Sequence, residues 1–110
     1  MKDAIFHPAA IAAVRSFPDA VRREFGKLLF DLQSGETLGM PMSRPMPSVG
    51  KGVHELRLRD RSGIYRAFYF TRDLRGILIF HAFVKKSQST PAHDLEMGRR
   101  RLKEMLNEEI

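Results

Sequence analysis

The chain has 110 residues, of which 43% are hydrophobic and 29% are charged, with a net charge of +6 and no cysteine. This length supports one hydrophobic core, so we expect a single domain over residues 1–110, and the composition excludes intrinsic disorder. The lack of cysteine excludes disulfides, and the longest apolar run, Ile77–Val84, is too short to span a membrane. Because no apolar signal segment is visible at its start, the protein is predicted to be cytoplasmic, with no membrane partner.

The first third of the chain is predicted to hold one short strand and two helices. Ala4–Phe6 favours a strand that Pro8 ends, and Ala9–Val14 favours helix by composition. Pro18 is suited to the first turn of a second helix, and Gly35 is suited to its end. Apolar residues of this second helix recur every three or four positions and predict one buried face, formed by Val21, Phe25, Leu28, Leu29 and Leu32.

Gly39–Gly52 is predicted to be an irregular loop. Its three prolines and its flanking glycines leave no room for a regular element. The loop also contains three methionines, Met40, Met42 and Met46. Either they cover the edge of the core or they take part in recognition, and the sequence leaves both readings open.

Three strands are predicted next, over Val53–Arg59, Gly63–Arg72 and Gly76–Val84. Short turns rich in Asp and Gly join them, which predicts an antiparallel meander. The last strand is almost entirely apolar, so we expect it to be central in the sheet and covered on both faces.

A basic helix is predicted at the end of the chain. Thr90 is expected to be its N-cap and Pro91 to lie in its first turn, and the helix should end near Asn107. Its apolar stripe is thin and Gly98 interrupts it, so the helix either docks on the domain or contacts a partner. The residues of the stripe are Leu95, Leu102, Met105 and Leu106.

Positive charge is concentrated in the second half of the chain. Residues 51–103 contain 13 Lys/Arg and 5 Asp/Glu, a net +8, whereas residues 1–50 have a net +1. Cations gathered on a sheet repel one another unless an anion compensates them, and RNA is a common polyanion in cells. Solvated surface charge is the alternative interpretation.

Motifs for metal or nucleotide chemistry are missing from the sequence. There is no phosphate-binding glycine loop, no GxSxG and no HExxH, and the four histidines lack a recognisable ligand spacing. We therefore expect no metal and no cofactor. What remains is metal-free phosphoryl chemistry, in which the 2′-hydroxyl of RNA attacks the adjacent phosphorus. Arginine binds phosphate well, and a lysine among other cations has a lowered pKa and can transfer protons.

Three segments together resemble the RelE/HigB toxins, and most closely the phage-derived Gp49-like branch. They are residues 55–57 (ELR), 63–66 (GIYR) and 81–91 (HAFVKKSQSTP), and the resemblance covers residues 53–106. It implies an α+β, RelE-like fold with two N-terminal helices packed on a small antiparallel sheet and a C-terminal helix. It also implies the toxin of a type II toxin–antitoxin system, a metal-independent mRNA endoribonuclease (mRNA interferase) that cleaves translated mRNA on the ribosome. A cognate antitoxin, usually of the helix-turn-helix type, would neutralise it.

The resemblance places catalytic roles on Arg57, Arg66, Lys85 and Lys86. Arg66 is the expected phosphate clamp, and one of the two lysines is the expected proton-transfer group. Two features depart from the family pattern: Glu55 stands where relatives often have a basic residue, and the tyrosine or histidine that several relatives use near the end is absent. The residues expected to bind RNA are Arg59, His54, Tyr65, Arg99 and Arg100.

Structural roles are the alternatives for these residues. The arginines of the strands would pair with Glu55 or Asp60, Tyr65 would pack in the core together with Tyr69, and His81 is expected to be a core histidine. For the whole chain, the alternative function is a non-catalytic basic module that binds nucleic acid or protein, such as an inactive toxin homologue.

Overall fold

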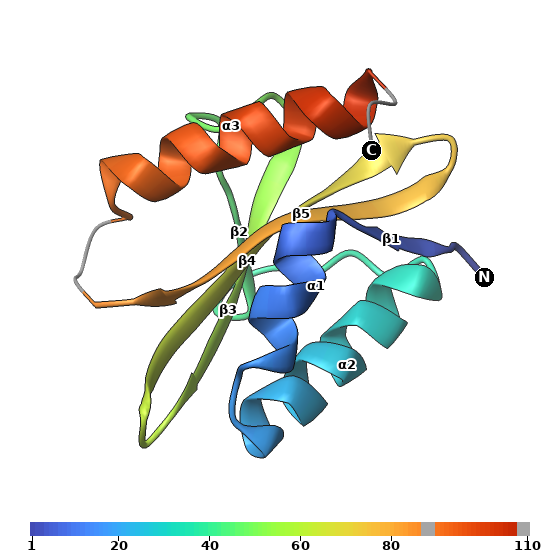
Figure 1. Cartoon of the computed structure of the whole chain (residues 1–110). Coiled ribbons are helices and arrows are strands. Elements are labelled where there is room, and N and C mark those ends of the chain that lie inside the picture. Colours follow the sequence, from blue (N-terminus) through green and yellow to red (C-terminus); the bar gives the residue numbers. More distant parts are fainter. Residues whose placement is uncertain (87–89, 108–110) are drawn as a thin grey trace.

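The computed structural model describes residues 1–86 and 90–107. Over these residues the chain forms three helices and one five-stranded sheet with the strand order β1-β5-β4-β3-β2 (Figure 1). Residues 87–89, which belong to the third segment of the family resemblance, lie outside the described residues. In chain order the elements are β1 (Ala4–Phe6), α1 (Pro8–Arg15), α2 (Asp19–Gln33), β2 (Ser43–Pro45), β3 (Val53–Asp60), β4 (Gly63–Asp73), β5 (Gly76–Lys85) and α3 (Ala92–Leu106).

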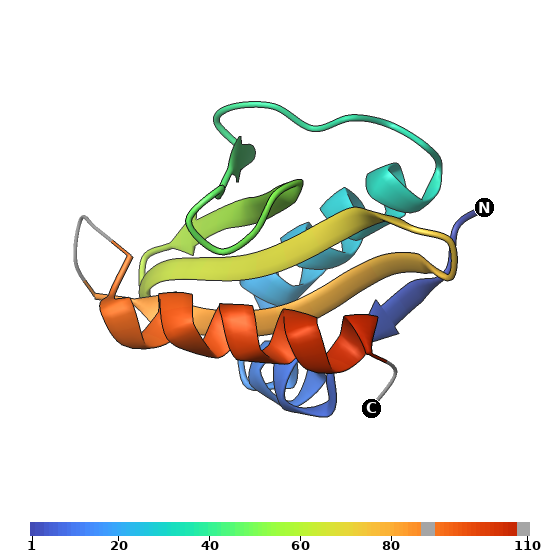
Figure 2. The same ribbon diagram turned by 90° about the horizontal axis from the view of Figure 1, so that it is seen from above.

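The sheet lies between two layers of helix. Helices α1 and α2 cover one face and α3 crosses the other, as the two perpendicular views show (Figures 1 and 2). Two apolar clusters fill these interfaces. The cluster beneath α1 and α2 includes Phe17, Phe25, Leu56, Tyr65 and Ile79, and the cluster beneath α3 includes Met46, Val53, Phe68, Phe80 and Leu102. The predicted α+β class is confirmed, but the arrangement around the sheet differs from the expected one in two respects.

The first difference is the direction of β1. The prediction of a wholly antiparallel sheet is wrong, because β1 pairs with β5 in parallel, with Ala4 opposite Ile77 and Phe6 opposite Ile79. The two chains approach closely at Gly76, where φ is +143° and a Cβ atom would lie 2.3 Å from the carbonyl oxygen of Asp3. Only glycine fits there, since a side chain would displace the N-terminal strand.

The second difference is a strand inside the segment that the sequence predicts to be a loop. Ser43–Pro45 forms β2, which pairs antiparallel with residues 54–56 of β3. The prolines do not prevent this because β2 is an edge strand of only three residues, and a proline on an edge loses no ladder bond on its outer side. The extended conformation is therefore imposed by pairing with β3.

The predicted meander of β3, β4 and β5 is confirmed. Both pairs are antiparallel, and β5 lies between β1 and β4 with apolar clusters on its two faces. The pairing of β4 with β5 shifts register between Phe68 and Tyr69, which marks a bulge. Side chains of β3, β4 and β5 thus alternate between the α1/α2 face and the α3 face of the sheet.

The buried face of α2 agrees with the periodicity of the sequence, whereas in α3 Leu102 and Met105 of the predicted stripe are buried but Leu106 is exposed. All five residues of the predicted α2 stripe are buried. The prediction that Thr90 caps α3 is wrong: Pro91 occupies the N-cap position, and the hydroxyl of Thr90 reaches Glu55 of the sheet instead. Gly98 of α3 packs directly on the ring of Phe68. Among the described residues, no helix has both the length and the apolar character needed to cross a membrane.

Candidate phosphate-binding site

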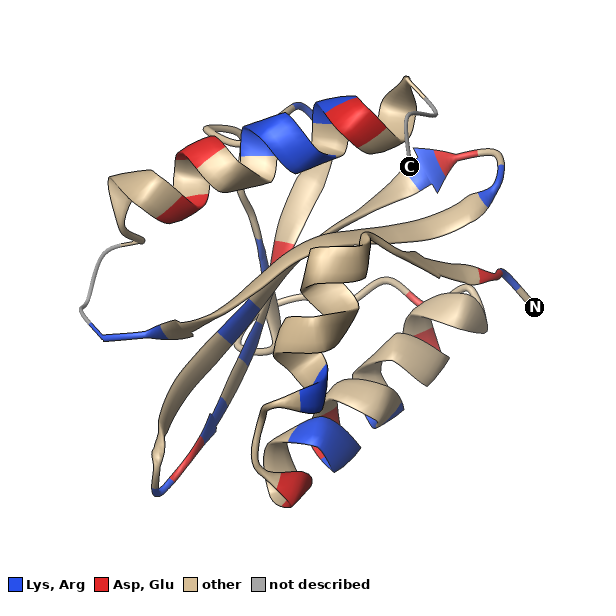
Figure 3. Cartoon of the chain, in the orientation of Figure 1, with Lys and Arg blue, Asp and Glu red and all other residues tan. Residues whose placement is uncertain are grey.

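Two arginines face each other across the middle of the β3–β4 hairpin. Arg57 and Arg66 are direct cross-strand partners. Arg57 shares a face with Val53, and Arg66 shares a face with Phe68, so both side chains lie on the α3 side of the sheet. Like charges in directly opposed positions destabilise a strand pair, so this position requires an anion nearby. Figure 3 shows the two strands with basic positions side by side.

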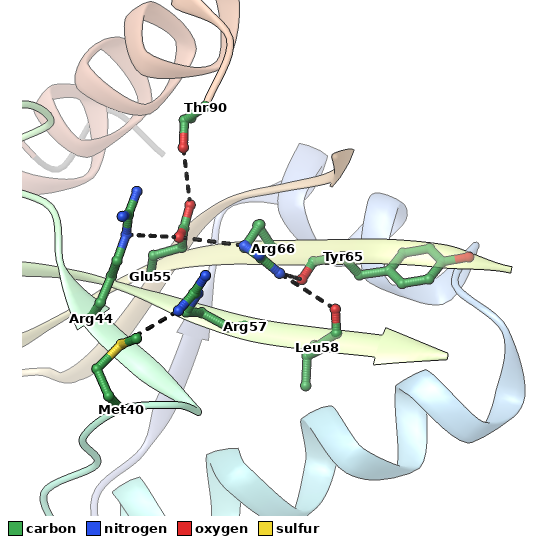
Figure 4. Close-up of polar contacts among 8 residues, drawn as sticks. All are labelled: Met40, Arg44, Glu55, Arg57, Leu58, Tyr65, Arg66 and Thr90. Atoms are coloured by element: carbon green, nitrogen blue, oxygen red, sulfur yellow. Dashed lines mark hydrogen bonds and ion pairs between the residues drawn. The ribbon is translucent and has the colours of Figure 1, made fainter. Parts of the chain in front are cut away.

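The anion that the protein itself provides is Glu55, which is fully buried. Its Oε1 atom lies 3.4 Å from Nε of Arg44 and 3.4 Å from Nε of Arg66. Its Oε2 atom accepts a hydrogen bond of 3.4 Å from Oγ1 of Thr90 at the start of α3. Figure 4 shows Arg44 and Arg66 on two sides of the carboxylate. Strands β2, β3 and β4 therefore meet at one buried carboxylate.

Arg66 is nearly buried, with 6% of its surface exposed. Its Nη1 atom donates to the carbonyl oxygens of Tyr65 at 3.1 Å and Leu58 at 3.5 Å. Burial lowers its pKa, and the charge of Glu55 opposes that shift. Within the described residues, Nε of Arg57 and Nε of Arg66 make no hydrogen bond, although Nε of Arg66 lies 3.4 Å from Oε1 of Glu55. The cluster thus holds donors that its own residues leave unused.

Lys85 joins this cluster from β5. It is 6% exposed and pairs with Ile64, next to the row that contains Arg66. Burial lowers the pKa of its ammonium group, the charges of Arg66, Arg44 and Arg57 lower it further, and Glu55 raises it. Lys86 follows the strand and is exposed. Of the two lysines that the sequence offers for proton transfer, Lys85 is the one that lies among the arginines.

A cleft of about 310 Å³ opens beside the arginines at the edge of β3. Strand β2 pairs only with residues 54–56, so the rest of β3 continues beyond it to Asp60. The residues that line the cleft are Pro41, Met42, Arg57, Leu58, Arg59 and Arg66. Three of the predicted site residues, Arg57, Arg59 and Arg66, are thus brought together at one opening.

Four predicted RNA-binding residues lie elsewhere. Tyr65 points to the α1/α2 face and packs on Phe17, with ring centroids 4.8 Å apart, so the core-packing alternative holds for it. His54 stacks on Tyr69 at 5.6 Å, on the same helical side. Arg99 and Arg100 are exposed on α3, where Nε of Arg99 donates to the carbonyl oxygen of Ser48 at 2.8 Å. None of these four side chains lines the cleft.

The prediction that His81 is a core histidine is confirmed. It is 5% exposed, between β5 and α3. Nη1 of Arg101 donates to its Nδ1 at 2.7 Å, so the ring is neutral there and its Nε2–H donates to Asp94 at 2.8 Å. Burial lowers the pKa of His81, and the hydrogen bond to Asp94 opposes the shift. The residue ties α3 to the sheet.

Two further expectations concern acidic partners. Asp60 does not pair with the strand arginines, because its carboxylate accepts hydrogen bonds from the backbone and hydroxyl of Ser62 within the hairpin turn. Glu55 does pair with Arg66, as the structural alternative required. Among residues 1–86 and 90–107, no group of three or more histidines and carboxylates is placed to hold a metal ion.

Sequence reasoning did not identify Arg44, Pro41 or Leu58 as parts of this site. Arg44 stands between Ser43 and Pro45 in a segment without periodicity, so only its pairing with Glu55 reveals its position. Of the three loop methionines, Met46 is buried beneath α3, whereas Met40 and Met42 are 62% and 38% exposed beside the arginines. The core-covering reading therefore holds for Met46, whereas recognition by Met40 and Met42 stays a prediction.

Comparison with known protein families adds one finding to this geometry. The family described as Phage derived protein Gp49-like (DUF891) matches residues 12–103, a range that contains every strand of the cluster from β2 to β5. A comparison with curated proteins finds no match. Because the family match covers most of the chain, the protein belongs to the phage-derived Gp49-like family.

Proposed function

We propose that this protein is the toxin of a type II toxin–antitoxin system, related to RelE and HigB, and that it is an endoribonuclease that cleaves translated mRNA on the ribosome without a metal. The observation that supports this proposal best is that Arg57 and Arg66 line an open cleft while Lys85 lies close enough to Arg66 for its pKa to be lowered by that charge. Membership of the Gp49-like family is compatible with it. A cognate antitoxin of the helix-turn-helix type is the proposed protein partner.

In the proposed reaction the 2′-oxygen of RNA attacks the adjacent phosphorus and the bond from phosphorus to the 5′-oxygen breaks. Arg57 and Arg66 bind the non-bridging oxygens, where negative charge increases in the transition state. The products are a 2′,3′-cyclic phosphate, which water can open to a 3′-phosphate, and a free 5′-hydroxyl. Arginine suits the clamp because its planar group stays protonated and binds phosphate through two donors.

Two protons move in this scheme. The 2′-hydroxyl releases its proton to solvent, and Lys85 donates a proton to the leaving 5′-oxygen. Burial and neighbouring cations lower the pKa of Lys85, so its ammonium group is a stronger acid than that of an exposed lysine. Lysine rather than arginine is needed for this step, because arginine does not release its proton.

The ribosome is the proposed place of action because the positive charge extends beyond the cleft. Residues 51–103 carry a net +8, and Arg99 and Arg100 are exposed on α3. Such a surface attracts polyphosphate over distances of about 10 Å at moderate salt. These residues would contact ribosomal RNA while the cleft holds the message.

The test is induced expression in bacteria, with growth recorded and the 5′ ends of a translated mRNA mapped by primer extension. Arg66→Lys keeps the buried charge but loses the two-donor geometry, and Arg23→Ala removes an exposed arginine of α2 as the control. Wild type and the control should arrest growth and produce discrete new ends, whereas Arg66→Lys should do neither while remaining folded by circular dichroism. A folded wild type that leaves growth and message intact would rule out the nuclease.

A non-catalytic binding module is the second candidate, and one observation favours it. Arg66 and Arg44 are already ion-paired with Glu55, so part of the cluster is neutralised within the protein. For such a module, every basic substitution should weaken RNA binding by a similar factor, with a steep salt dependence and no cleavage products. A loss of cleavage in Arg66→Lys that is much larger than its loss of RNA binding supports the enzyme instead.

A further inference from the structure

The cleft beside the arginines has two chemically different walls. Arg57, Arg59 and Arg66 contribute cationic side chains to its lining, and Pro41 and Met42 contribute apolar ones, whereas the side chain of Leu58 lies in the core beneath α1 and α2. A site for phosphate alone needs only the cationic wall. The volume of about 310 Å³ lies at the lower end of the range for small-molecule sites, which is more than a phosphate group requires.

The apolar wall is held in place by the backbone. The amide of Arg57 donates to the carbonyl oxygen of Met42 at 2.8 Å, which fixes this segment along β3. The amides of Met42 and Ser43 both donate to the carbonyl oxygen of Gly39 at 3.1 Å, which closes a turn around Met40. The wall is therefore a formed surface next to the guanidinium groups.

Met42 of this wall and the neighbouring Met40, which does not line the cleft, are exposed although they are apolar. Met42 is 38% exposed and Met40 is 62% exposed, and Sδ of Met40 accepts a hydrogen bond of 3.4 Å from Nη1 of Arg57 (Figure 4). Met46 of the same segment is buried in the core, so the exposure is not a general property of the loop. Exposed apolar surface at a polar cleft is typical of a ligand-binding site.

A ligand that covers both walls must carry an anion and a flat apolar group close to it. A nucleotide has both, since its phosphate and its base are joined through one sugar. Thioethers contact aromatic rings favourably, and guanidinium planes stack on bases. Inorganic phosphate or a sugar phosphate would leave the wall of Pro41 and Met42 uncovered.

We propose that the cleft binds one nucleotide of RNA, with its phosphate on Arg57 and Arg66 and its base against Pro41 and Met42. The inference rests on the proposed function in taking RNA as the ligand, and it names the part of the site that contacts the base. The wall of Pro41 and Met42 then determines which nucleotide is preferred next to the cut. Contacts to an unstacked base are the usual means by which proteins read single-stranded RNA.

The experiment compares three probes on the full chain by calorimetric titration: inorganic phosphate, ribose 5-phosphate and the four nucleoside 3′-monophosphates. At least one nucleotide should bind about tenfold more tightly than ribose 5-phosphate. Met42→Ala should reduce nucleotide affinity by about three- to tenfold and leave ribose 5-phosphate unchanged. Arg66→Lys should weaken all probes, and Leu74→Ala, which changes a fully exposed residue of the β4–β5 turn, is the matched control.

Equal affinity for nucleotides and ribose 5-phosphate, or an unchanged nucleotide affinity in Met42→Ala, would overturn the inference. Binding is measured without cleavage, so the two proposals fail separately. If the protein binds nucleotides through Met42 but cleaves no mRNA, the nuclease proposal fails and the base contact stands. If the protein cleaves mRNA but binds nucleotides no more tightly than ribose 5-phosphate, the nuclease proposal stands and the base contact fails.

Discussion

Replacing the buried carboxylate of Glu55 is the most direct test of what stabilises the cationic cluster. Glu55→Gln keeps the shape of the side chain and removes the charge that lies 3.4 Å from two guanidinium groups. Removing one partner of a buried ion pair costs about 3–5 kcal/mol, because the other charge stays buried. The side chain of Arg44 is 40% exposed and keeps part of its hydration, so we expect a loss near the lower limit, about 3 kcal/mol. That is a large fraction of a typical stability of about 5–15 kcal/mol.

The assay is urea denaturation near neutral pH at low salt. Asp19→Asn is the matched control: its pair with Arg22 has side-chain exposures of 75% and 44%, so its removal should cost less than about 1 kcal/mol. Phosphate provides a second measurement. It can replace the missing anion, and at 100 times its dissociation constant it should restore about 2.7 kcal/mol to Glu55→Gln. Chloride at the same ionic strength should not.

Two results would refute this reasoning. If Glu55→Gln unfolds at the same urea concentration as wild type, or no earlier than Asp19→Asn, the buried carboxylate does not stabilise the arginines. If the variant is destabilised but phosphate stabilises it no more than wild type, the cluster does not accept phosphate in place of the carboxylate.

Three further predictions concern the helices, a buried histidine and the proposed acid. In Gly98→Ala the new Cβ would lie 2.7 Å from the ring of Phe68, so we expect a loss of about 1–3 kcal/mol in urea denaturation. Gly26→Ala places its Cβ in open space on α2 and should increase the free energy of unfolding by up to about 1 kcal/mol. If the two substitutions change stability equally, the close packing of α3 on Phe68 is contradicted. Burial lowers the pKa of His81 below its ordinary value of 6.5, so the unfolded chain binds a proton that the folded chain excludes. The contribution of the neutral ring to the free energy of unfolding should be fully present above pH 6.5 and decrease as pH falls below it. His81→Asn should make the stability decrease less steeply with falling pH. The same slope in this variant and in wild type would show that His81 does not cause the decrease. The rate of RNA cleavage should fall as pH rises through the lowered pKa of Lys85, because the proton donor is lost. Lys85→Arg keeps the positive charge but should abolish most of the cleavage activity. Full activity in that variant would exclude Lys85 as the acid.

The elements that could be predicted from the sequence are those whose pattern is local. The stripe of α2 and the alternation and short turns of β3, β4 and β5 each identify an element without knowledge of its neighbours. Strand β2 could not be predicted in this way, because Ser43–Pro45 has low strand propensity and becomes extended only by pairing with β3. The direction of β1 could not be predicted either, since three residues do not encode which partner they meet.

The candidate site shows the same division. The short turn between β3 and β4 fixes the register, so the meeting of Arg57 and Arg66 was predictable. The alternation of a strand also implies that Tyr65 and Arg66 point to opposite faces, a signal that argues against grouping them at one site. The contribution of Arg44 depends on a tertiary contact with Glu55, and no local sequence pattern indicates that contact.

The parallel pairing of β1 with β5 has a consequence for synthesis of the chain. Ala4 is made first, but its partner Ile77 follows roughly 70 residues later, which at about 5–20 residues per second is a delay of roughly 4–15 s. Until then β1 has no partner and the apolar faces of α1 and α2 have no complete sheet to cover. Lys85 is added later still. A chain whose translation stops before β5 therefore lacks part of the cationic cluster, so only copies that extend through β5 can assemble it.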